Sequence, residues 1–187
     1  MIQANLRDIH REDLGKILDW RNQEFIRNVM FSDSIISWEQ HITWYANLLK
    51  SSNMISKIFT LDNEDYGILN ITDIDLVSNK CNWGFYIGKN NPTKGAGLFL
   101  GFTSLEYIFS IMGIRKLCAE VLGSNLISQN FHDKLGFKLD GVLRKHIQRN
   151  EKFEDVLLYS IFNDEWQETS SNIRMELEER FKCHKLK

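Results

Sequence analysis

Residues 125–137 have the sequence NLISQNFHDKLGF, and this stretch decides which fold the chain is expected to adopt. It starts with Asn125, a residue type that favours helix N-caps because its side-chain oxygen accepts a hydrogen bond from a free backbone N–H. The stretch therefore predicts a short helix over residues 125–135. A strand over 115–122 is expected before it, and a pair of strands is expected after it.

A glycine-rich turn, NNPTKGAG at residues 90–97, lies upstream between a predicted strand and a predicted helix. A Walker phosphate loop is excluded because Lys94 precedes the glycines and no Ser or Thr follows them in the required place. A dinucleotide-binding fingerprint fits poorly because Gly101, the third glycine, comes one position too late. Two interpretations remain: a loop that only turns the chain, or a turn whose backbone N–H groups and helix dipole bind a diphosphate.

The rest of the chain alternates between strand and helix patterns. In strand 81–87, Cys81, Trp83, Phe85 and Ile87 alternate with other residues, and Gly84 is interpreted as a bulge. Ser37 and Gln40 form a capping box that predicts a helix start. Strands are expected at 3–9, 56–61, 66–74, 81–87, 115–122, 137–148 and 153–162, and helices from Asp13, after Ser37, at 97–112, at 125–135 and from 163.

This order predicts an α/β fold with a mixed sheet, antiparallel at first and parallel where a helix crosses between strands 81–87 and 115–122. One domain is expected over residues 1–162, and 163–187 is expected to form a charged helix that is part of it or a packing arm. The first helix after Ser37 should place His41, Trp44, Tyr45, Leu48 and Leu49 on one side.

Composition excludes several classes of protein. The chain has 187 residues, with 23 Lys and Arg against 25 Asp and Glu, so a partner bound by broad phosphate neutralisation, such as nucleic acid, is not expected. No apolar run is long enough for a membrane span, and the charged start shows no signal peptide. The three cysteines are scattered and suit a reducing cytoplasm, and no metal is predicted.

Residues 125–137 resemble the N-x-x-[AS]-x-x-[LF]-[YH]-E-K-L-G-F signature of the GNAT acyl-CoA-dependent N-acetyltransferases. Asn125, Ser128, Phe131 and the run Lys134 to Phe137 match, while Asp133 stands where Glu is commoner. The resemblance covers about residues 3–162 and includes the K-G-A-G turn upstream. It implies acetyl-CoA as cosubstrate, direct attack of an amine on the thioester without an acyl-enzyme, and a splay between strands 81–87 and 115–122 that receives the pantetheine.

The resemblance also assigns cofactor contacts. Backbone N–H groups of the glycine turn would bind the diphosphate, and those beside Gly84 would polarise the thioester carbonyl. The sole proline, Pro92, departs from the family, which usually has Gln or Arg three residues before the first glycine. The expected cofactor contacts are Phe85, Tyr86, Ile87, Thr93, Lys94, Gly95, Ala96, Gly97, Leu98 and Asn125.

Three residues are candidates for proton transfer. Glu120 is the first choice as base because a lone Glu among apolar residues is costly to bury unless it is used or paired; the alternative is a solvated sheet face or a lysine partner. His41 is the second choice, and its alternative is a core histidine with satisfied hydrogen bonds. His132 stands where the family usually has the Tyr that protonates the CoA thiolate, so it is the candidate acid.

Shorter motifs resemble the GNAT branch that acetylates UDP-linked 4-amino-4,6-dideoxy sugars in pseudaminic-acid biosynthesis. Arg can pair with a nucleotide phosphate and Trp can stack on uracil, although Met30 and Trp44 could equally be core residues. The expected acceptor contacts are Arg21, Arg27, Met30, Trp44 and Thr72. The alternatives are acetylation of a protein N-terminus in the ribosomal-protein style and a CoA-binding domain without catalysis; a homodimer is a further expectation.

Overall fold

The computed structural model describes residues 3–149 and 151–185, with side chains described up to residue 179. Its centre is one seven-stranded sheet with the strand order β1-β2-β3-β4-β5-β7-β6. Only β4 and β5 are parallel among these described strands, so the predicted mixed sheet is confirmed. The strands are β1 (Ala4–Asp8), β2 (Ile55–Leu61), β3 (Glu64–Asp75), β4 (Lys80–Ile87), β5 (Lys116–Leu122), β6 (Lys138–Arg149) and β7 (Lys152–Phe162).

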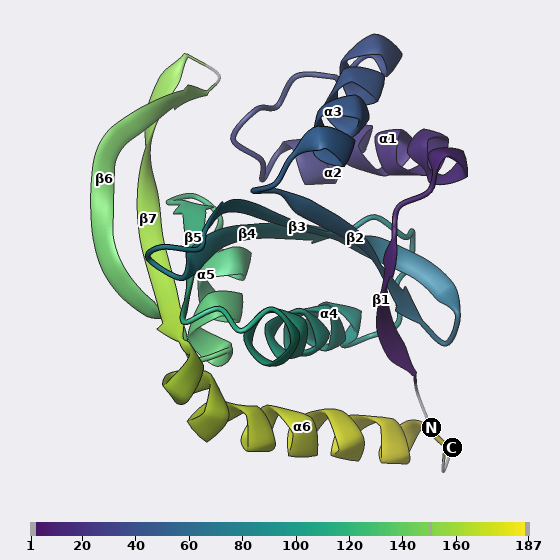
Figure 1. The fold of residues 1–187 in the computed structure, drawn as a ribbon, viewed down its shortest axis with the longest axis vertical. Coiled ribbons are helices and arrows are strands. Elements are labelled where there is room, and N and C mark those ends of the chain that lie inside the picture. The colour runs from purple at the N-terminus through teal and green to yellow at the C-terminus, as the bar shows by residue number, and fades with distance from the viewer. Residues whose placement is uncertain (1–2, 150, 186–187) are drawn as a thin grey trace.

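Helices cover both faces of the sheet, and each predicted helix is found. Figure 1 shows α1, α2 and α3 on one side and α4, α5 and α6 on the other. The helices are α1 (Leu14–Asn22), α2 (Glu24–Arg27), α3 (Trp38–Lys50), α4 (Ala96–Glu106), α5 (Leu126–Lys134) and α6 (Asn163–Lys185), with a short 3₁₀ turn at Arg11–Asp13 and a π turn at Tyr107–Ile111. No helix of the described part of the chain is long and apolar enough to cross a membrane.

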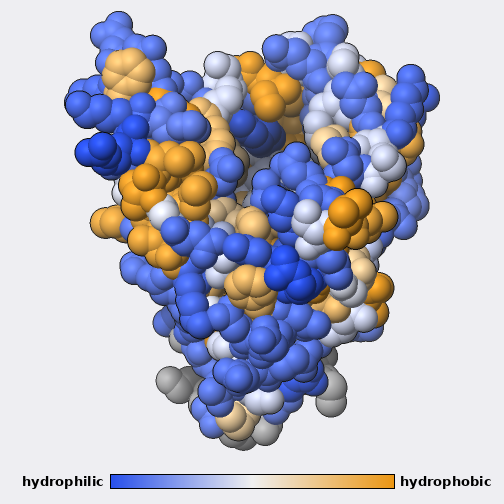
Figure 2. Space-filling view, turned by 60° about the vertical axis from the view of Figure 1, so that its left-hand side comes forward, coloured by the Kyte–Doolittle hydropathy of each residue, from blue (hydrophilic) through white to orange (hydrophobic). Residues whose placement is uncertain are grey.

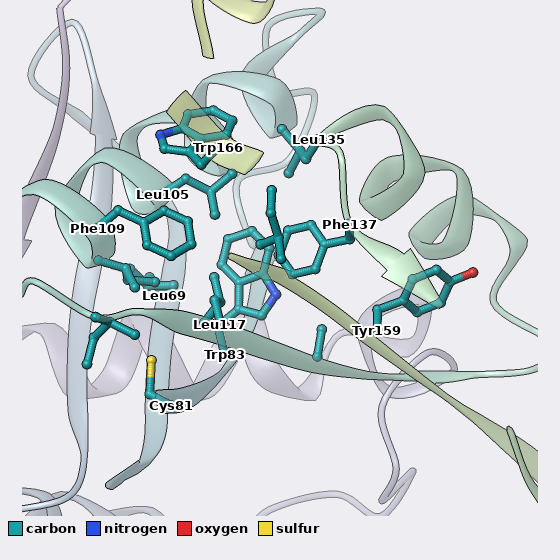
Figure 3. Packing of buried hydrophobic residues seen from close by; sticks show 14 of the residues in the cluster. Leu69, Cys81, Trp83, Leu105, Phe109, Leu117, Leu135, Phe137, Tyr159 and Trp166 are labelled. Carbon is teal, nitrogen blue, oxygen red and sulfur yellow. The ribbon is translucent and has the colours of Figure 1, made fainter. Parts of the chain in front are cut away.

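Strand alternation divides the core into two parts. Leu69 belongs to a large cluster under α4 and α6, whereas its neighbour Ile68 packs with Leu14 and Ile17 of α1 on the opposite face. Successive side chains of a strand point to opposite faces, so one strand serves both clusters. Figure 3 shows the larger cluster around Trp83, with aromatic and aliphatic side chains from several elements closing on it.

Helix α6 contributes to this larger cluster. Trp166 is fully buried, and Ile173 and Leu177 are buried beside it. The Trp166 indole N–H donates to the Glu106 carboxylate of α4 over 2.9 Å, which satisfies the one polar group of that side chain. The charged appearance of this helix in the sequence therefore belongs to its outer face only.

The capping box that opens α3 is present. The backbone N–H of Gln40 donates to Ser37 Oγ, and the N–H of Ser37 donates to Gln40 Oε1 over 2.8 Å. The predicted apolar side of α3 is only partly correct, because Leu49 is 68% exposed while His41 is buried. Leu49 lies in the last turn of α3, where nothing covers that side of the helix.

The pairing of β4 with β5 is short. It runs from Lys80 opposite Lys116 to Asn82 opposite Cys118 and then stops, whereas β4 stays paired with β3 as far as Ile87. The two parallel strands therefore diverge after Asn82, and the predicted splay is confirmed. The predicted bulge at Gly84 is wrong, because Gly84 pairs in register with Asn70 and the irregularity of this ladder lies between Thr72 and Asp75.

Candidate active site

The splay leaves one edge of β4 without a neighbouring strand. Beyond Asn82, every second N–H and C=O of β4 is directed towards the gap, because the alternate groups are used in the ladder with β3. Phe85, Tyr86 and Ile87 lie on this edge and are half-buried. The gap can therefore accept an extended ligand that forms backbone hydrogen bonds as a strand would.

The glycine turn supplies the second part of the site. Gly95 is the N-cap of α4 and has φ 93°, a left-handed conformation that glycine adopts without strain. The N–H groups of Ala96 and Leu98 donate to the carbonyls of Thr93 and Gly95 within the turn, so the prediction that they bind a diphosphate is wrong.

The remaining amides of this turn fit an anion. The N–H groups of Lys94, Gly95 and Gly97 have no backbone acceptor among the residues that the structure describes. A Cβ added at Gly97 would meet no atom within 4 Å, so there is open space in front of these amides. Free amides, open space and the N-terminal dipole of α4 suit the diphosphate of CoA. The hydroxyl of Thr93 is instead bonded to that of Tyr66 over 2.9 Å.

Gly101 has a different role from the glycines of the turn. A Cβ at Gly101 would lie 2.7 Å from Phe131 and 2.9 Å from Leu135. Its lack of a side chain lets α4 pack closely against α5 and the residues after it. Gly101 therefore serves helix packing, and its spacing from Gly95 and Gly97 need not fit a dinucleotide-binding fingerprint.

A cavity of about 450 Å³ lies on the α1 face of the sheet, and we call it the α1–α3 cavity. It reaches Gly84 and Phe85, beyond the last β4–β5 pair, and therefore adjoins the splay. Figure 2 shows the surface hollowed between two raised flanks, which Figure 1 identifies as the β6–β7 hairpin and the α1–α3 helices. The cavity is lined by Ile17, Arg21, Met30, Ser32, Ser34, Ile35, Ile36, Gln40, His41, Trp44, Ile68, Asn70, Gly84, Phe85 and Tyr86.

The cavity brings together four residues that the sequence nominated for catalysis or acceptor binding: Arg21, Met30, His41 and Trp44. It also contains polar residues that sequence reasoning missed, above all Asn70. The alternation of strand 66–74 places Asn70 on the same face as Thr72, which was predicted to contact the acceptor. Asn70 could therefore have been predicted as an acceptor contact from the sequence.

Arg21 brings an uncompensated positive charge to this cavity. Its Nη2 donates to the Ser32 carbonyl over 2.9 Å, while its Nη1 is buried and has no hydrogen-bond partner. Burial lowers the pKa of Arg21, and burial raises the pKa of the neighbouring Tyr86 phenol, with Arg21 opposing that rise. No Asp or Glu is among the described residues that line the cavity.

His41 is buried in the cavity wall. Its ring stacks on Trp44 with centroids 5.0 Å apart, and its Nε2 has no hydrogen-bond partner. Burial lowers the pKa of His41, and the backbone of Leu14 opposes this shift. A neutral imidazole with a free ring nitrogen can accept a proton, and the alternative of a histidine with satisfied hydrogen bonds does not hold at Nε2.

Glu120 lies elsewhere than its sequence context suggested. Leu117, Ala119 and Val121 are buried under the helices, whereas Glu120 is exposed on the opposite face. The pairing of Cys118 with Asn82 places Glu120 on the same sheet face as the α1–α3 cavity, across the splay from it. The expectation that burial makes this carboxylate special is therefore wrong, and Glu120 does not line the cavity.

His132 is a core residue, and its predicted role as acid is wrong. Nδ1 lies 2.7 Å from the Ser128 carbonyl, to which it donates, and Nε2 accepts from the Trp83 indole N–H over 3.2 Å. Burial lowers the pKa of this histidine. Both ring nitrogens are occupied inside the protein, so the ring has no proton to give to a thiolate.

Two predicted acceptor contacts also lie outside the cavity. Arg27 donates to the carbonyls of Asn22 and Asp33 over 3.1 and 2.7 Å, and so holds the loop after α2 in place. Thr72 donates to its neighbour Asp73 over 3.3 Å. Their polar groups are engaged locally, which explains why the cavity does not include them.

Asn125 caps α5 as predicted. Its Oδ1 accepts from the Ser128 N–H over 3.1 Å, which satisfies one free amide at the helix start. The cap accounts for this residue with no ligand present.

Comparison with known proteins identifies the family. The family described as "Acetyltransferase (GNAT) domain" matches residues 6–158. Spermidine N(1)-acetyltransferase from Escherichia coli K12 is 20% identical over 163 residues, which cover 87% of this chain and 88% of that protein. Acetyltransferase PseH from Campylobacter jejuni is 27% identical over 122 residues, which cover 65% of this chain and 74% of that protein.

A solved structure agrees with the fold. The crystal structure of spermidine N-acetyltransferase from Vibrio cholerae in complex with CoA and spermine superposes with a TM-score of 0.82. The sequence identity is 20%, and the superposition covers 88% of this chain and 98% of that one. The splay, the free amides before α4 and the family match over most of the chain lead to one conclusion: the chain belongs to the GNAT family and is an acetyl-CoA-dependent N-acetyltransferase.

Proposed function

We propose that the protein transfers the acetyl group of acetyl-CoA to the 4-amino group of a UDP-linked 4-amino-4,6-dideoxy sugar, as in pseudaminic-acid biosynthesis. The observation that carries this proposal is the charge of the α1–α3 cavity. Arg21 has a buried, unpartnered Nη1 there, and none of the described lining residues is acidic. An anionic group on the acceptor would supply the missing counter-charge.

The same charge argues against a polyamine acceptor. A polyamine keeps one or more ammonium groups after the reacting amine has lost its proton, and nearby carboxylates would stabilise those groups most strongly. The α1–α3 cavity offers Arg21 instead, and a like charge in a partly buried site opposes binding. A UDP group carries negative charge for Arg21, and Trp44 and Met30 offer apolar surface for the uracil.

The residues suggest how the reaction would run. The amine nitrogen attacks the thioester carbonyl carbon, the C–N bond forms, the C–S bond breaks, and CoA leaves as a thiolate that takes up a proton. His41 lines the cavity, and its Nε2, buried in the cavity wall without a hydrogen-bond partner, is the proposed base for the proton that the amine loses. Backbone N–H groups on the open edge at Phe85 to Ile87 would stabilise the carbonyl oxygen as its charge grows.

Glu120 is the alternative base. It is solvent-exposed and on the same sheet face, so it would act through water. The cofactor contacts that the geometry supports best are the amides of Lys94, Gly95 and Gly97 with the exposed Lys94 side chain.

The test is a comparison of acceptors. Purified protein and acetyl-CoA are incubated with a UDP-4-amino-4,6-dideoxy sugar, with spermidine and with a peptide bearing a free N-terminus. Thiol release gives kcat/KM, and mass spectrometry locates the acetyl group. We expect kcat/KM for the sugar nucleotide to exceed that for spermidine by about 100-fold or more, equivalent to about 2.7 kcal/mol. Preference for spermidine or for the peptide would overturn the proposal.

Arg21→Gln tests the charge argument within this assay. Removing the guanidinium should lower kcat/KM for the sugar nucleotide by about 10- to 100-fold, since a charge-assisted hydrogen bond is lost. The Kd for acetyl-CoA, measured by calorimetry, should not change. Arg11→Gln, an exposed position outside the cavity, is the matched control and should behave as wild type.

A further inference from the structure

Three small polar or side-chain-free residues form a row across the sheet, and the row ends at the α1–α3 cavity. Ser56 of β2 pairs with Asn70 of β3, and Asn70 pairs with Gly84 of β4. Because directly paired residues of antiparallel strands share a face, all three lie on the side of the sheet that bears the cavity. Asn70 and Gly84 line the cavity itself.

Ser56 fixes the orientation of the Asn70 amide. The Ser56 hydroxyl donates to Asn70 Oδ1 over 2.6 Å. The carbonyl side of the amide is therefore engaged, and its Nδ2 has no acceptor among the side chains and backbone that the structure describes. The result is a pair of N–H donors on the cavity wall that no described protein group accepts from.

Gly84 keeps the space beside this amide open. A Cβ at Gly84 would meet no atom within 4 Å, whereas one at Gly67 would lie 2.1 Å from the Tyr86 carbonyl and one at Gly88 would lie 2.2 Å from Trp20. Packing therefore demands glycine at those two positions and does not demand it at Gly84. Gly84 also lies two residues past Asn82, where the gap between β4 and β5 begins.

We propose that Asn70 is a specificity-determining residue, whose Nδ2 donates a hydrogen bond to the oxygen substituent on the carbon next to the amine-bearing carbon of the acceptor. Ser56 is its positioning residue, and Gly84 leaves room for the acceptor between Asn70 and the splay. This inference rests on the proposed function for the nature of that oxygen: a 4-amino-4,6-dideoxy sugar carries a hydroxyl on C3, next to its amine. A linear polyamine has only a methylene group there, so the contact would also discriminate between the two acceptors.

The first experiment measures acceptor and acetyl-CoA kinetics for Asn70→Ala and Asn70→Asp. Losing one neutral hydrogen bond should lower kcat/KM for the acceptor about tenfold, and Asp, which replaces the donor by a second acceptor group, should lower it further. The KM for acetyl-CoA should stay unchanged in both. Asn5→Ala, on an exposed position of β1 outside the cavity, is the matched control.

Ser56 is tested by its effect on Asn70. Ser56→Ala should raise the KM for the acceptor about threefold, because the amide is no longer held in one orientation. Ser56→Thr keeps the hydroxyl and should restore the wild-type value, and Ser56→Ala should have no further effect when Asn70 is already Ala. A purely structural role would lower the melting temperature without this pattern in KM.

Gly84→Ala tests the open space. The substitution should leave the melting temperature within about 2 °C of wild type, since a change well below 1 kcal/mol is expected where the added methyl group meets nothing. It should lower kcat/KM for the acceptor by about tenfold or more. Gly141→Ala, a strand glycine outside the cavity whose added Cβ also meets nothing within 4 Å, should leave activity unchanged.

The acceptor panel separates this inference from the proposed function. The variants are assayed with whichever amine the wild-type enzyme turns over best. If that amine is the peptide, whose carbonyl oxygen is on the carbon next to the amine-bearing carbon, the proposed function fails, while an increased KM for the Asn70 variants still supports the contact. If that amine is spermidine, which has no such oxygen, both the proposed function and this inference are overturned. If the Asn70 variants match wild type with any acceptor that bears an oxygen beside its amine, the inference is overturned. If the wild-type enzyme turns over no acceptor in the panel, both are overturned.

Discussion

Two buried histidines of this enzyme differ in what their ring nitrogens contact. His41 lines the α1–α3 cavity and its buried Nε2 has no hydrogen-bond partner, whereas His132 has both nitrogens bonded inside the core. Burial lowers the pKa of both side chains from 6.5, so both are neutral at pH 7. Of these two histidines, His41 is therefore the one that we propose as the base.

The pH profile tests the proposed role of His41. A histidine acts as a base in its neutral form. If His41 is the base, kcat should be constant above about pH 6.5 and should fall as the pH falls through the lowered pKa of His41. His41→Gln should lower kcat by about 100-fold and remove this acidic limb. His146→Gln, at an exposed position, is the control. An unchanged acidic limb in His41→Gln would assign the base to another group, with Glu120 next in line.

His132→Ala should affect stability and leave the pH profile of kcat as it is. The change removes a buried ring and leaves the Trp83 N–H without its acceptor, which should cost about 2–4 kcal/mol of unfolding free energy. Urea unfolding at pH 7.5 measures this cost.

The pH dependence of that stability has a definite sign. Between the lowered pKa of His132 and 6.5, the unfolded chain binds more protons than the folded one, so stability falls as the pH falls through this window. His132→Ala should lose less stability than wild type between pH 7 and pH 5.5. If His132→Ala had wild-type stability and no activity, His132 would act as the acid that protonates the CoA thiolate, against the conclusion drawn from its hydrogen bonds.

We expect acetyl-CoA binding to depend most on the start of α4. Gly97 is the second residue of α4, and a Cβ there meets nothing in the protein. Gly97→Ala should raise helix stability by up to about 1 kcal/mol, because Ala is the better helix former. It should also weaken acetyl-CoA binding by about tenfold or more, because the methyl group fills the space before the free amides.

Calorimetry and thermal unfolding of the same samples check both expectations for Gly97→Ala. Gly15→Ala is a close control, since Gly15 is the second residue of α1 and its Cβ would also meet nothing within 4 Å. It should share the gain in stability without the loss of affinity. Equal affinities for the two variants would place the diphosphate elsewhere.

Sequence patterns predicted the elements well and the cavity poorly, for physical reasons. Alternation and capping are local, so strand β4 and the start of α3 followed from residues such as Trp83 and Ser37. The loop after α2, which forms one wall of the cavity, has no repeating pattern of apolar and polar residues. The sequence therefore did not indicate that Ser32 and Ser34 line the cavity. Glu120 was misinterpreted although its alternation with Ala119 already placed the two on opposite faces.

Over the whole molecule, the large cluster joins the sheet to its last helix. Trp166 is fully buried in that cluster. Trp166→Ala should lower the unfolding free energy by about 3–5 kcal/mol, through lost burial and the cavity left behind. Urea unfolding should remain a single transition, since α6 shares one core with the sheet.

Met175→Ala is the control for this prediction, because Met175 of α6 is 56% exposed. It should change stability by less than about 0.5 kcal/mol. A loss below about 1 kcal/mol for Trp166→Ala, or an early separate transition for α6, would show that the helix is an appendage that the rest of the fold does not need.

We expect the strand edge that β4 exposes after Asn82 to affect the lifetime of the enzyme against proteolysis as well. Its open N–H and C=O groups have no partner on β5, and a cosubstrate in the gap would bond to them. Because acetyl-CoA binds the folded protein and not the unfolded chain, we expect its binding to stabilise the folded state. At a free concentration 100 times Kd, binding adds about 2.7 kcal/mol. Resistance to proteolysis, and with it the amount of enzyme in a cell, should therefore rise with the supply of acetyl-CoA. Through the gap in the sheet, the rate at which the protein is degraded would then depend on the concentration of the acetyl-CoA that its reaction consumes.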